Sequence, residues 1–208
     1  MEREAADGVK ETGRVEAFSD GVFAIAITLL ILDVKVPELS DGAGTRDLLR
    51  ALGRGWTSYV AYLLSFVTIL IMWVSHHRIF TIVRKIDHAF LFWNGILLML
   101  ISFVPFPTAL LSRYLLEPSA RTAAAIYSGH AILISLAFQA MWRHATKTDR
   151  LLVPGSRHEV TRLTARYRFG PLMYVTTFAL AFVSAWLSVG LCLVFTLFYA
   201  FQGLTHKG

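Results

Sequence analysis

The chain is dominated by apolar stretches that are long enough to cross a lipid bilayer. A transmembrane helix needs about 20 mostly apolar residues, because the hydrocarbon core is about 30 Å thick and a helix rises about 1.5 Å per residue. The last stretch is too long for one crossing and fits two shorter ones, with a turn around residues 184–188. The sequence therefore predicts an all-α integral membrane protein with six transmembrane helices in one domain, residues 1–208. The stretches lie at residues 15–36, 56–76, 88–111, 122–142 and 167–203.

Composition and the placement of charge agree with this class. Hydrophobic residues make up 55% of the 208 residues, whereas soluble domains contain about 45 to 50% even with glycine counted. The net charge of +6 forms no basic stripe of the kind that binds nucleic acid, because Lys and Arg lie between the apolar stretches. With the N-terminus inside, the inner segments hold 14 of these residues and the outer segments 6. The positive-inside rule then predicts a multi-pass plasma-membrane protein with both termini in the cytoplasm.

Several shorter features refine this picture. Pro105 and Pro107 are expected to kink or end the third span, and residues 45–55 to form an amphipathic helix at the membrane surface. The basic run 143–168 is expected to contact anionic lipid headgroups. Because Cys192 is the one cysteine, an internal disulfide is excluded. No metal site and no cofactor are expected, since the adjacent histidines His76 and His77 would face different ways on a helix.

The first span opens with a carboxylate, which must be explained in a membrane helix. On a helix turning about 100° per residue, Asp20 falls opposite the stripe that contains Ile25, Leu29 and Leu32, together with Ala24, Ile27 and Ile31. Thr28 lies on the edge of that stripe. A carboxylate that faces lipid is costly, so Asp20 is expected to point into the protein.

Depth in the membrane selects the partners of Asp20. The inner end of the second span and the start of the third lie within roughly 10 Å of the same surface as Asp20. We therefore predict a buried polar group, called the polar anchor below, which holds the helix bundle together. Its members are Arg14, Ser19, Asp20, Trp73, His76 or His77, and Asn94.

These residues carry a family resemblance. Arg14, Phe18, Ser19 and Asp20 spell R-x-x-x-F-S-D at the head of the first span. This motif, "WVSHHR" at the end of span two and "FWNGILLMLISFVPFPTALL" in span three resemble the transmembrane protein 175 family of potassium channels over nearly the whole chain. The resemblance implies a homotetramer whose pore is lined by the first helix of each subunit. It places a hydrophobic constriction at Ile25 and a hydroxyl layer at Thr28.

The pore assignment has alternatives. Leu29 and Leu32 would continue the lining outward, and Asp33 could concentrate cations at the outer mouth, but the same stripe could equally pack against other helices. The chain lacks a T-V-G-Y-G carbonyl filter, so selectivity would have to come from side chains. We expect a potassium-selective leak channel that needs only permeant K⁺. Proton conduction and secondary cation transport remain open, whereas an enzyme is disfavoured because no nucleophile and base lie at one depth.

Overall fold

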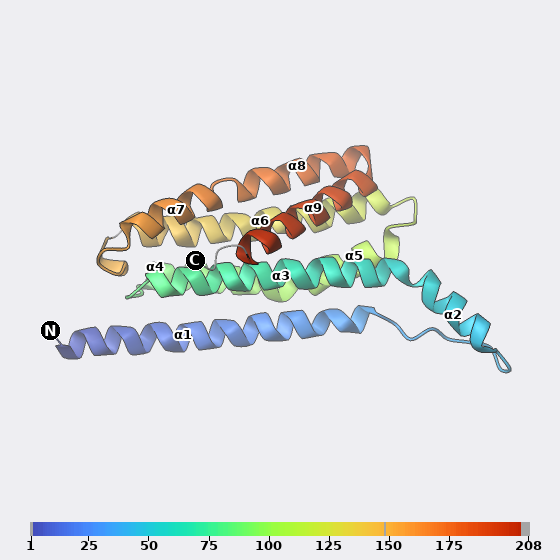
Figure 1. The fold of residues 1–208 in the computed structure, drawn as a ribbon, viewed down its shortest axis with the longest axis horizontal. Coiled ribbons are helices and arrows are strands. Elements are labelled where there is room, and N and C mark those ends of the chain that lie inside the picture. The colour runs from blue at the N-terminus through green and yellow to red at the C-terminus, as the bar shows by residue number, and fades with distance from the viewer. Residues whose placement is uncertain (1, 148, 205–208) are drawn as a thin grey trace.

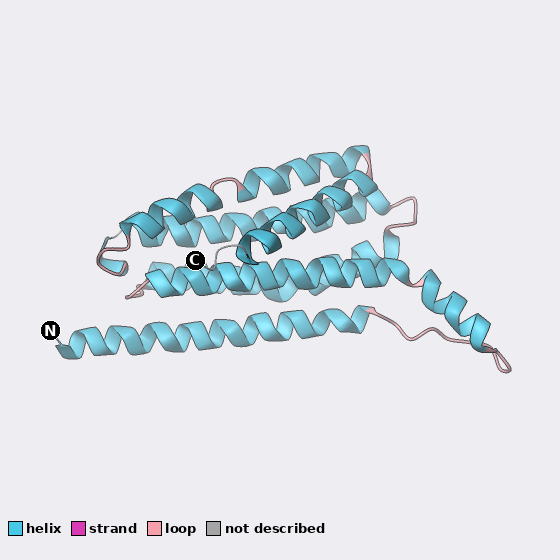
Figure 2. Cartoon of the chain, in the orientation of Figure 1, coloured by secondary structure: helices cyan, strands magenta, loops and turns pink. Residues whose placement is uncertain are grey.

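The computed structural model describes residues 2–147 and 149–204, and these residues form helices joined by short loops (Figure 1). No strand occurs in the described part, as Figure 2 shows by its colours. The elements are α1 (Glu2–Leu29), α2 (Thr45–Arg54), α3 (Trp56–Ile82), α4 (His88–Phe103), α5 (Pro105–Tyr114), α6 (Ala120–Lys147), α7 (Arg157–Tyr167), α8 (Gly170–Val183) and α9 (Ala185–Leu204), with two short 3-10 turns, η1 (Leu30–Asp33) and η2 (Asp149–Leu151).

Four segments are long and apolar enough to cross a membrane. They coincide with the first four predicted spans, although α3 and α6 extend beyond the predicted ends. The predicted all-α membrane class is therefore confirmed. The C-terminal stretch is divided, because α8 ends at Val183 and α9 begins at Ala185, with Ser184 in extended conformation between them. The count of six crossings stays a prediction, since α8 has only 14 residues. The four segments are 12–33, 56–82, 88–114 and 120–147.

The third span is broken at Pro105, as predicted. Proline has no N–H to donate, so the Ile101 carbonyl accepts instead from the Val104 amide, at 3.1 Å. The Leu100 carbonyl thereby loses its regular partner, the amide four residues on. His130 of α6 replaces that partner, with Nε2 2.9 Å from the Leu100 oxygen. A carbonyl only accepts, so Nε2 of His130 carries the proton. This contact ties α6 to the break between α4 and α5.

The loops at the end of the bundle near the start of α4 are joined to one another. Leu151 accepts hydrogen bonds from the amides of Arg84 and Lys85, at 2.7 and 3.2 Å. Thr12 of α1 donates to the Arg84 carbonyl at 3.1 Å. The basic run after α6 is therefore folded, with α7 packed beside α6 (Figure 1) and the Trp142 indole donating to Thr164 at 2.9 Å.

Helix α1 lies at one side of the bundle, and α8 lies at the opposite side with α6 (Figure 1). The first span is the least buried of the four: 22% of its most apolar window is buried within the chain, against 61% for the span 120–147. Helix α2 projects from the N-terminal end of α3 (Figure 1). It contains no buried residue, as expected for a helix that lies at a surface.

Candidate functional site

One face of α1, from residue 17 onward, is left exposed by the described part of the chain. Phe23, Ala26 and Leu30 are buried against the bundle, and the opposite face is open. Ile25 and Leu32 on that face are each 61% exposed. Every predicted pore-lining residue lies there: Ile25, Thr28, Leu29 and Leu32 are all exposed.

The open face is rotated from the predicted stripe. Ala24 and Ile31 were placed on the opposite side by periodicity, but both are exposed, Ile31 by 50%. At about 100° per residue, the open face is centred near Thr28 and no longer near Ile25. Only Asp20 and Ile27 of the predicted opposite side are half-buried. Helical periodicity gives the relative angles of side chains, but not the angle at which the helix meets its neighbours.

The hydroxyl of Thr28 has a defined orientation. Its proton is donated to the Ile25 carbonyl at 2.9 Å, a common arrangement for threonine in a helix. The lone pairs of Oγ1 are therefore free to accept a donor or to contact a cation. Because the residue is exposed at the centre of the open face, Thr28 presents an oxygen ligand away from its own bundle.

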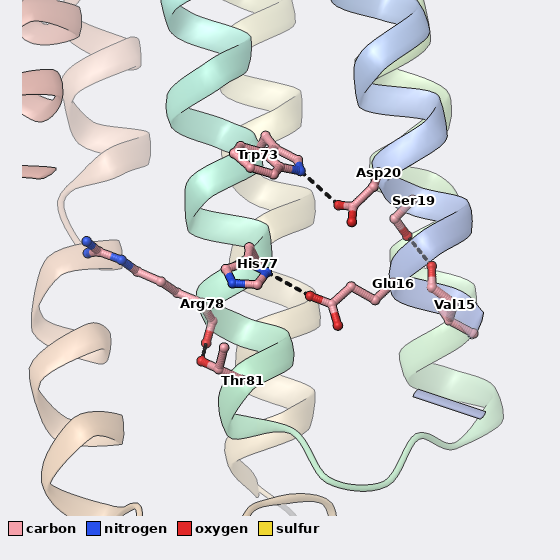
Figure 3. Close-up of polar contacts among 8 residues, drawn as sticks. All are labelled: Val15, Glu16, Ser19, Asp20, Trp73, His77, Arg78 and Thr81. Carbon is pink, nitrogen blue, oxygen red and sulfur yellow. Dashed lines mark hydrogen bonds and ion pairs between the residues drawn. The ribbon is translucent and has the colours of Figure 1, made fainter. Parts of the chain in front are cut away.

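Two contacts join α1 to α3 beside the open face (Figure 3). The Trp73 indole donates to Oδ1 of Asp20 at 2.8 Å, and Nδ1 of His77 lies 2.8 Å from Oε1 of Glu16. Glu16 and Asp20 are four residues apart on α1, as are Trp73 and His77 on α3. The two contacts therefore lie one helical turn apart along the same pair of helices. The prediction that Asp20 points into the protein toward Trp73 agrees with this geometry. The part played by Glu16 was missed, although its spacing from Asp20 matches that of His77 from Trp73.

A second group of contacts lies deeper, between α1, α3 and α4. The Asn94 amide donates to Ser19 Oγ at 3.1 Å, and Ser19 donates in turn to the Val15 carbonyl at 2.8 Å. Oδ1 of Asn94 is 2.9 Å from Nε2 of His76 and can only accept, so Nε2 carries the proton. Ser19 and His76 are fully buried. Nδ1 of His76 has no hydrogen-bond partner in the described part of the chain.

The polar anchor is therefore split into a buried part and a half-buried part, and one predicted member lies apart. Arg14 is exposed, and no hydrogen bond or ion pair joins its side chain to the others within the described ranges. It lines an open hollow beside α4 with Phe18, which is 68% exposed. Arg14 is one turn below Phe18 on the open face of α1, which explains why it points away from Asp20.

The remaining predicted residue, Asp33, ends η1 at the far end of α1 and is half-buried. No group of three His, Cys, Asp or Glu side chains in the described part converges in a way that could hold a metal ion. The site thus consists of an exposed apolar face of α1 that carries the Thr28 hydroxyl. Hydrogen bonds from the other side of α1 to α3 and α4 hold the helix in place.

Comparisons with known proteins place this all-helical, multi-pass membrane protein in a family of membrane channels. Residues 14–105 match the family model described as "Endosomal/lysosomal potassium channel TMEM175". The chain belongs to the TMEM175 family, which confirms the resemblance carried by Arg14, Phe18, Ser19 and Asp20. An ion channel is not an enzyme.

Bacterial relatives cover nearly the whole chain. The potassium channel Cha6605_3372 of Chamaesiphon minutus is 55% identical and covers 92% of this chain and 95% of its own length. The potassium channel B446_29190 of Streptomyces collinus is 50% identical and covers 93% and 94%. The crystal structure of a lysosomal potassium-selective channel TMEM175 homolog from Chamaesiphon minutus superimposes with a TM-score of 0.84, at 53% identity, over 93% of this chain and 98% of that one.

A human relative has a different printed activity. The endosomal/lysosomal proton channel TMEM175 of Homo sapiens is 33% identical over 80% of this chain. The present chain spans about a third of the human protein, since the match covers 32% of it.

Proposed function

We propose that this chain is a potassium-selective leak channel that assembles as a homotetramer around α1. The observation that carries the proposal is the open face of α1: an apolar membrane helix with its exposed stripe turned away from its own bundle. Symmetry-related copies bury such a stripe and can enclose a pore between them. The bacterial relatives named as potassium channels support potassium as the permeant ion.

The constriction is assigned to Ile25. A ring of four isoleucine side chains excludes water when they are close together, so the barrier to an ion is dehydration and not charge repulsion. One turn further along, four Thr28 hydroxyl oxygens face the same space with their protons donated elsewhere. Such a ring partly replaces the hydration shell of K⁺ in place of a carbonyl filter. Leu29 and Leu32 continue the lining, and Asp33 draws cations to the outer mouth.

The bracing contacts hold α1 at a fixed rotation about its axis. The Asp20 to Trp73 and Glu16 to His77 contacts attach one flank, and Ser19 with Asn94 attaches the buried back. A change of rotation would move Ile25 out of register with its copies. In this proposal the polar anchor sets the geometry of the pathway without lining it.

The topology completes the proposal. In this proposal helices α8 and α9 add two short crossings to the four long ones, so both termini lie on one side of the plasma membrane, and the positive-inside rule assigns that side to the cytoplasm. The end that holds the α3–α4 loop and α7 is then cytoplasmic, and α2 is outside. No cofactor takes part, and membrane lipid and permeant K⁺ are the other partners.

Proton conduction through the same pathway is the second candidate, because the human relative is named a proton channel. It differs from potassium leak only in the ion that passes the Ile25 ring. Secondary transport has less support, since coupled carriers use paired broken helices near the midplane, whereas the described break at Pro105 is a single one.

Ion flux from purified protein in liposomes tests the proposal. Under a set potential, we expect K⁺ to pass faster than Na⁺, a large organic cation to be excluded, and flux to persist without any proton or sodium gradient. Ile25→Ala should raise conductance and weaken the preference for K⁺, whereas Ile27→Ala, half-buried beside the core, should leave permeation nearly unchanged. Equal effects of the two substitutions would refute the assigned pore face. Acidification that continued unchanged with K⁺ absent would favour the proton reading.

A further inference from the structure

Two hollows meet at Arg121, on the side of the bundle opposite α1. The first lies between the α5–α6 loop and the break between α8 and α9, with a volume of about 340 Å³; Glu117, Arg121, Ser184 and Trp186 are among its lining residues. The second runs between α6 and α8, with a volume of about 500 Å³. Both volumes fall in the range of small-molecule sites. Beyond the first turn of α6 the walls of the second hollow are apolar. They include Ile126, Gly129, Leu133, Phe178 and Phe182.

The two hollows lie at the depths of a lipid headgroup and of its acyl chains. Trp56 and Trp186 stack at 5.9 Å at this end of the bundle, and tryptophan marks the interface between headgroups and hydrocarbon. From Arg121 to Leu133, α6 rises about 18 Å, which is close to the thickness of one leaflet, about 15 Å. Gly129 lets the ring of Phe178 pack closely against α6 in the wall of the second hollow, because a Cβ there would lie 3.3 Å from the ring.

Two side chains of opposite charge, Glu117 and Arg121, lie where the two hollows meet. Glu117 and Arg121 are both exposed, and neither side chain makes a hydrogen bond or ion pair within the described ranges. A guanidinium binds phosphate through two parallel hydrogen bonds, and a carboxylate accepts from an ammonium group. A headgroup that carries a phosphate and a primary ammonium a few bonds apart matches both side chains.

We propose that this junction binds a phospholipid of the outer leaflet with a phosphoethanolamine headgroup. Arg121 binds the phosphate, Glu117 accepts from the ammonium group, and an acyl chain lies in the second hollow, between α6 and α8. The orientation of this face toward lipid rests on the proposed function, which places α1 at the centre of the oligomer. An anionic lipid that lacks the ammonium group, such as phosphatidylglycerol, satisfies Arg121 alone.

Native mass spectrometry of the full-length channel in detergent tests the site, with lipids added one at a time. We expect phosphatidylethanolamine to bind roughly tenfold more tightly than phosphatidylglycerol, which is the size of one charge-assisted hydrogen bond. Arg121→Gln should lower the affinity for both lipids by about tenfold. Glu117→Gln should abolish the preference for phosphatidylethanolamine over phosphatidylglycerol. Arg143→Gln, on the opposite end of the same helix, and Glu38→Gln, away from both hollows, are the charge-matched controls.

Each other outcome contradicts the site. Equal affinity of the wild type for the two lipids, or equal effects of Arg121→Gln and Arg143→Gln, would mean that only general charge attraction operates. Loss of oligomer mass on Arg121→Gln without loss of lipid would mean that a second copy of the chain covers this face. Potassium flux is measured separately on the same variants, so a failure of the channel proposal is distinguishable from a failure of the lipid site.

Discussion

The two layers of the polar anchor differ in burial, and the cost of breaking them should differ accordingly. Asn94→Ala removes an amide that pairs with buried Ser19 and His76, and a buried unpaired donor costs about 1 to 3 kcal/mol. Trp73→Phe removes one donor from Asp20, which is only half-buried, so we expect a cost of about 1 kcal/mol or less. Melting temperatures of the purified oligomer measure both changes.

The control for this comparison is Ser102→Ala, which removes an exposed hydroxyl from the same helix as Asn94. Its melting temperature should match that of the wild type. A loss of ion selectivity with an unchanged melting temperature in Asn94→Ala would instead place Asn94 in the conduction path.

A carboxylate with a shifted pKa, that of Asp87, lies just outside the membrane spans, before the first residue of α4. Oδ1 of Asp87 accepts from the Phe90 amide at 2.8 Å, and Nε2 of His144 lies 2.9 Å from both carboxylate oxygens. Partial burial acts to raise the pKa of Asp87, but these hydrogen bonds outweigh burial and hold the pKa below its usual value. A carboxylate of this kind stabilises the fold above its unfolded pKa, near 3.9, and the stabilisation is lost as pH falls through the folded value.

Asp87→Asn should therefore lower the melting temperature near neutral pH and have less effect below about pH 4. Asparagine remains a good N-cap, so this variant isolates the contribution of charge, while Asp87→Ala also removes the cap, at about 1 kcal/mol. The Asp87 side chain is 42% exposed, so solvent screening keeps the charge contribution small. Melting curves from pH 3 to 7 provide the check. A difference that grew as pH fell would reverse the assigned sign.

The break between α4 and α5 couples two residues that are far apart in sequence. His130→Ala leaves the Leu100 carbonyl unpaired, at a cost of about 1 kcal/mol or more. Pro105→Ala restores an amide that can bond to Ile101, which frees the Val104 amide for Leu100. In the Pro105→Ala background the loss of His130 should therefore cost less, and a double-mutant cycle should give a coupling of about 1 kcal/mol.

The same cycle run with Gln139→Ala in place of His130→Ala is the control. Gln139 also bonds a backbone carbonyl, that of Tyr167, but far from the break. Strict additivity in the His130 cycle would mean that proline and histidine act independently.

The helices were predictable from sequence because the length and apolarity of a span are local properties. Depth along the helices also brought Asp20 to the level of Trp73, and Ser19 to the level of Asn94, but it did not show that these are two separate sets of contacts. Rotation was not predictable: the open face is centred on Thr28 because of how Phe23 and Leu30 pack against other helices. The partner of His130 likewise depends on which carbonyl the proline frees in a different helix.

Viewed as a whole, the molecule is asymmetric in burial, and this asymmetry determines how copies of it can assemble. The first span is the least buried within the chain, and α8 lies on the opposite side (Figure 1). A helix with this much exposed apolar surface faces either lipid or another copy. The proposed function takes the second arrangement, in which the acceptor lone pairs of Thr28 Oγ1, unused in its bond to the Ile25 carbonyl, face ions or water in a pore.

Cysteine cross-linking separates these arrangements. Because Cys192 is the one cysteine and is buried, Cys192→Ala provides a background without competing thiols. In that background Ile25→Cys should form disulfide-linked dimers in membranes under mild oxidant, because four copies near one axis bring their Cβ atoms toward the roughly 4 Å that a disulfide requires. The products should stop at dimers, since each thiol pairs once. Ala26→Cys, one residue on but buried against its own bundle, should stay monomeric. Cross-linking at both positions would reflect random collision, and cross-linking at neither would place α1 at the lipid boundary and remove it from the pathway.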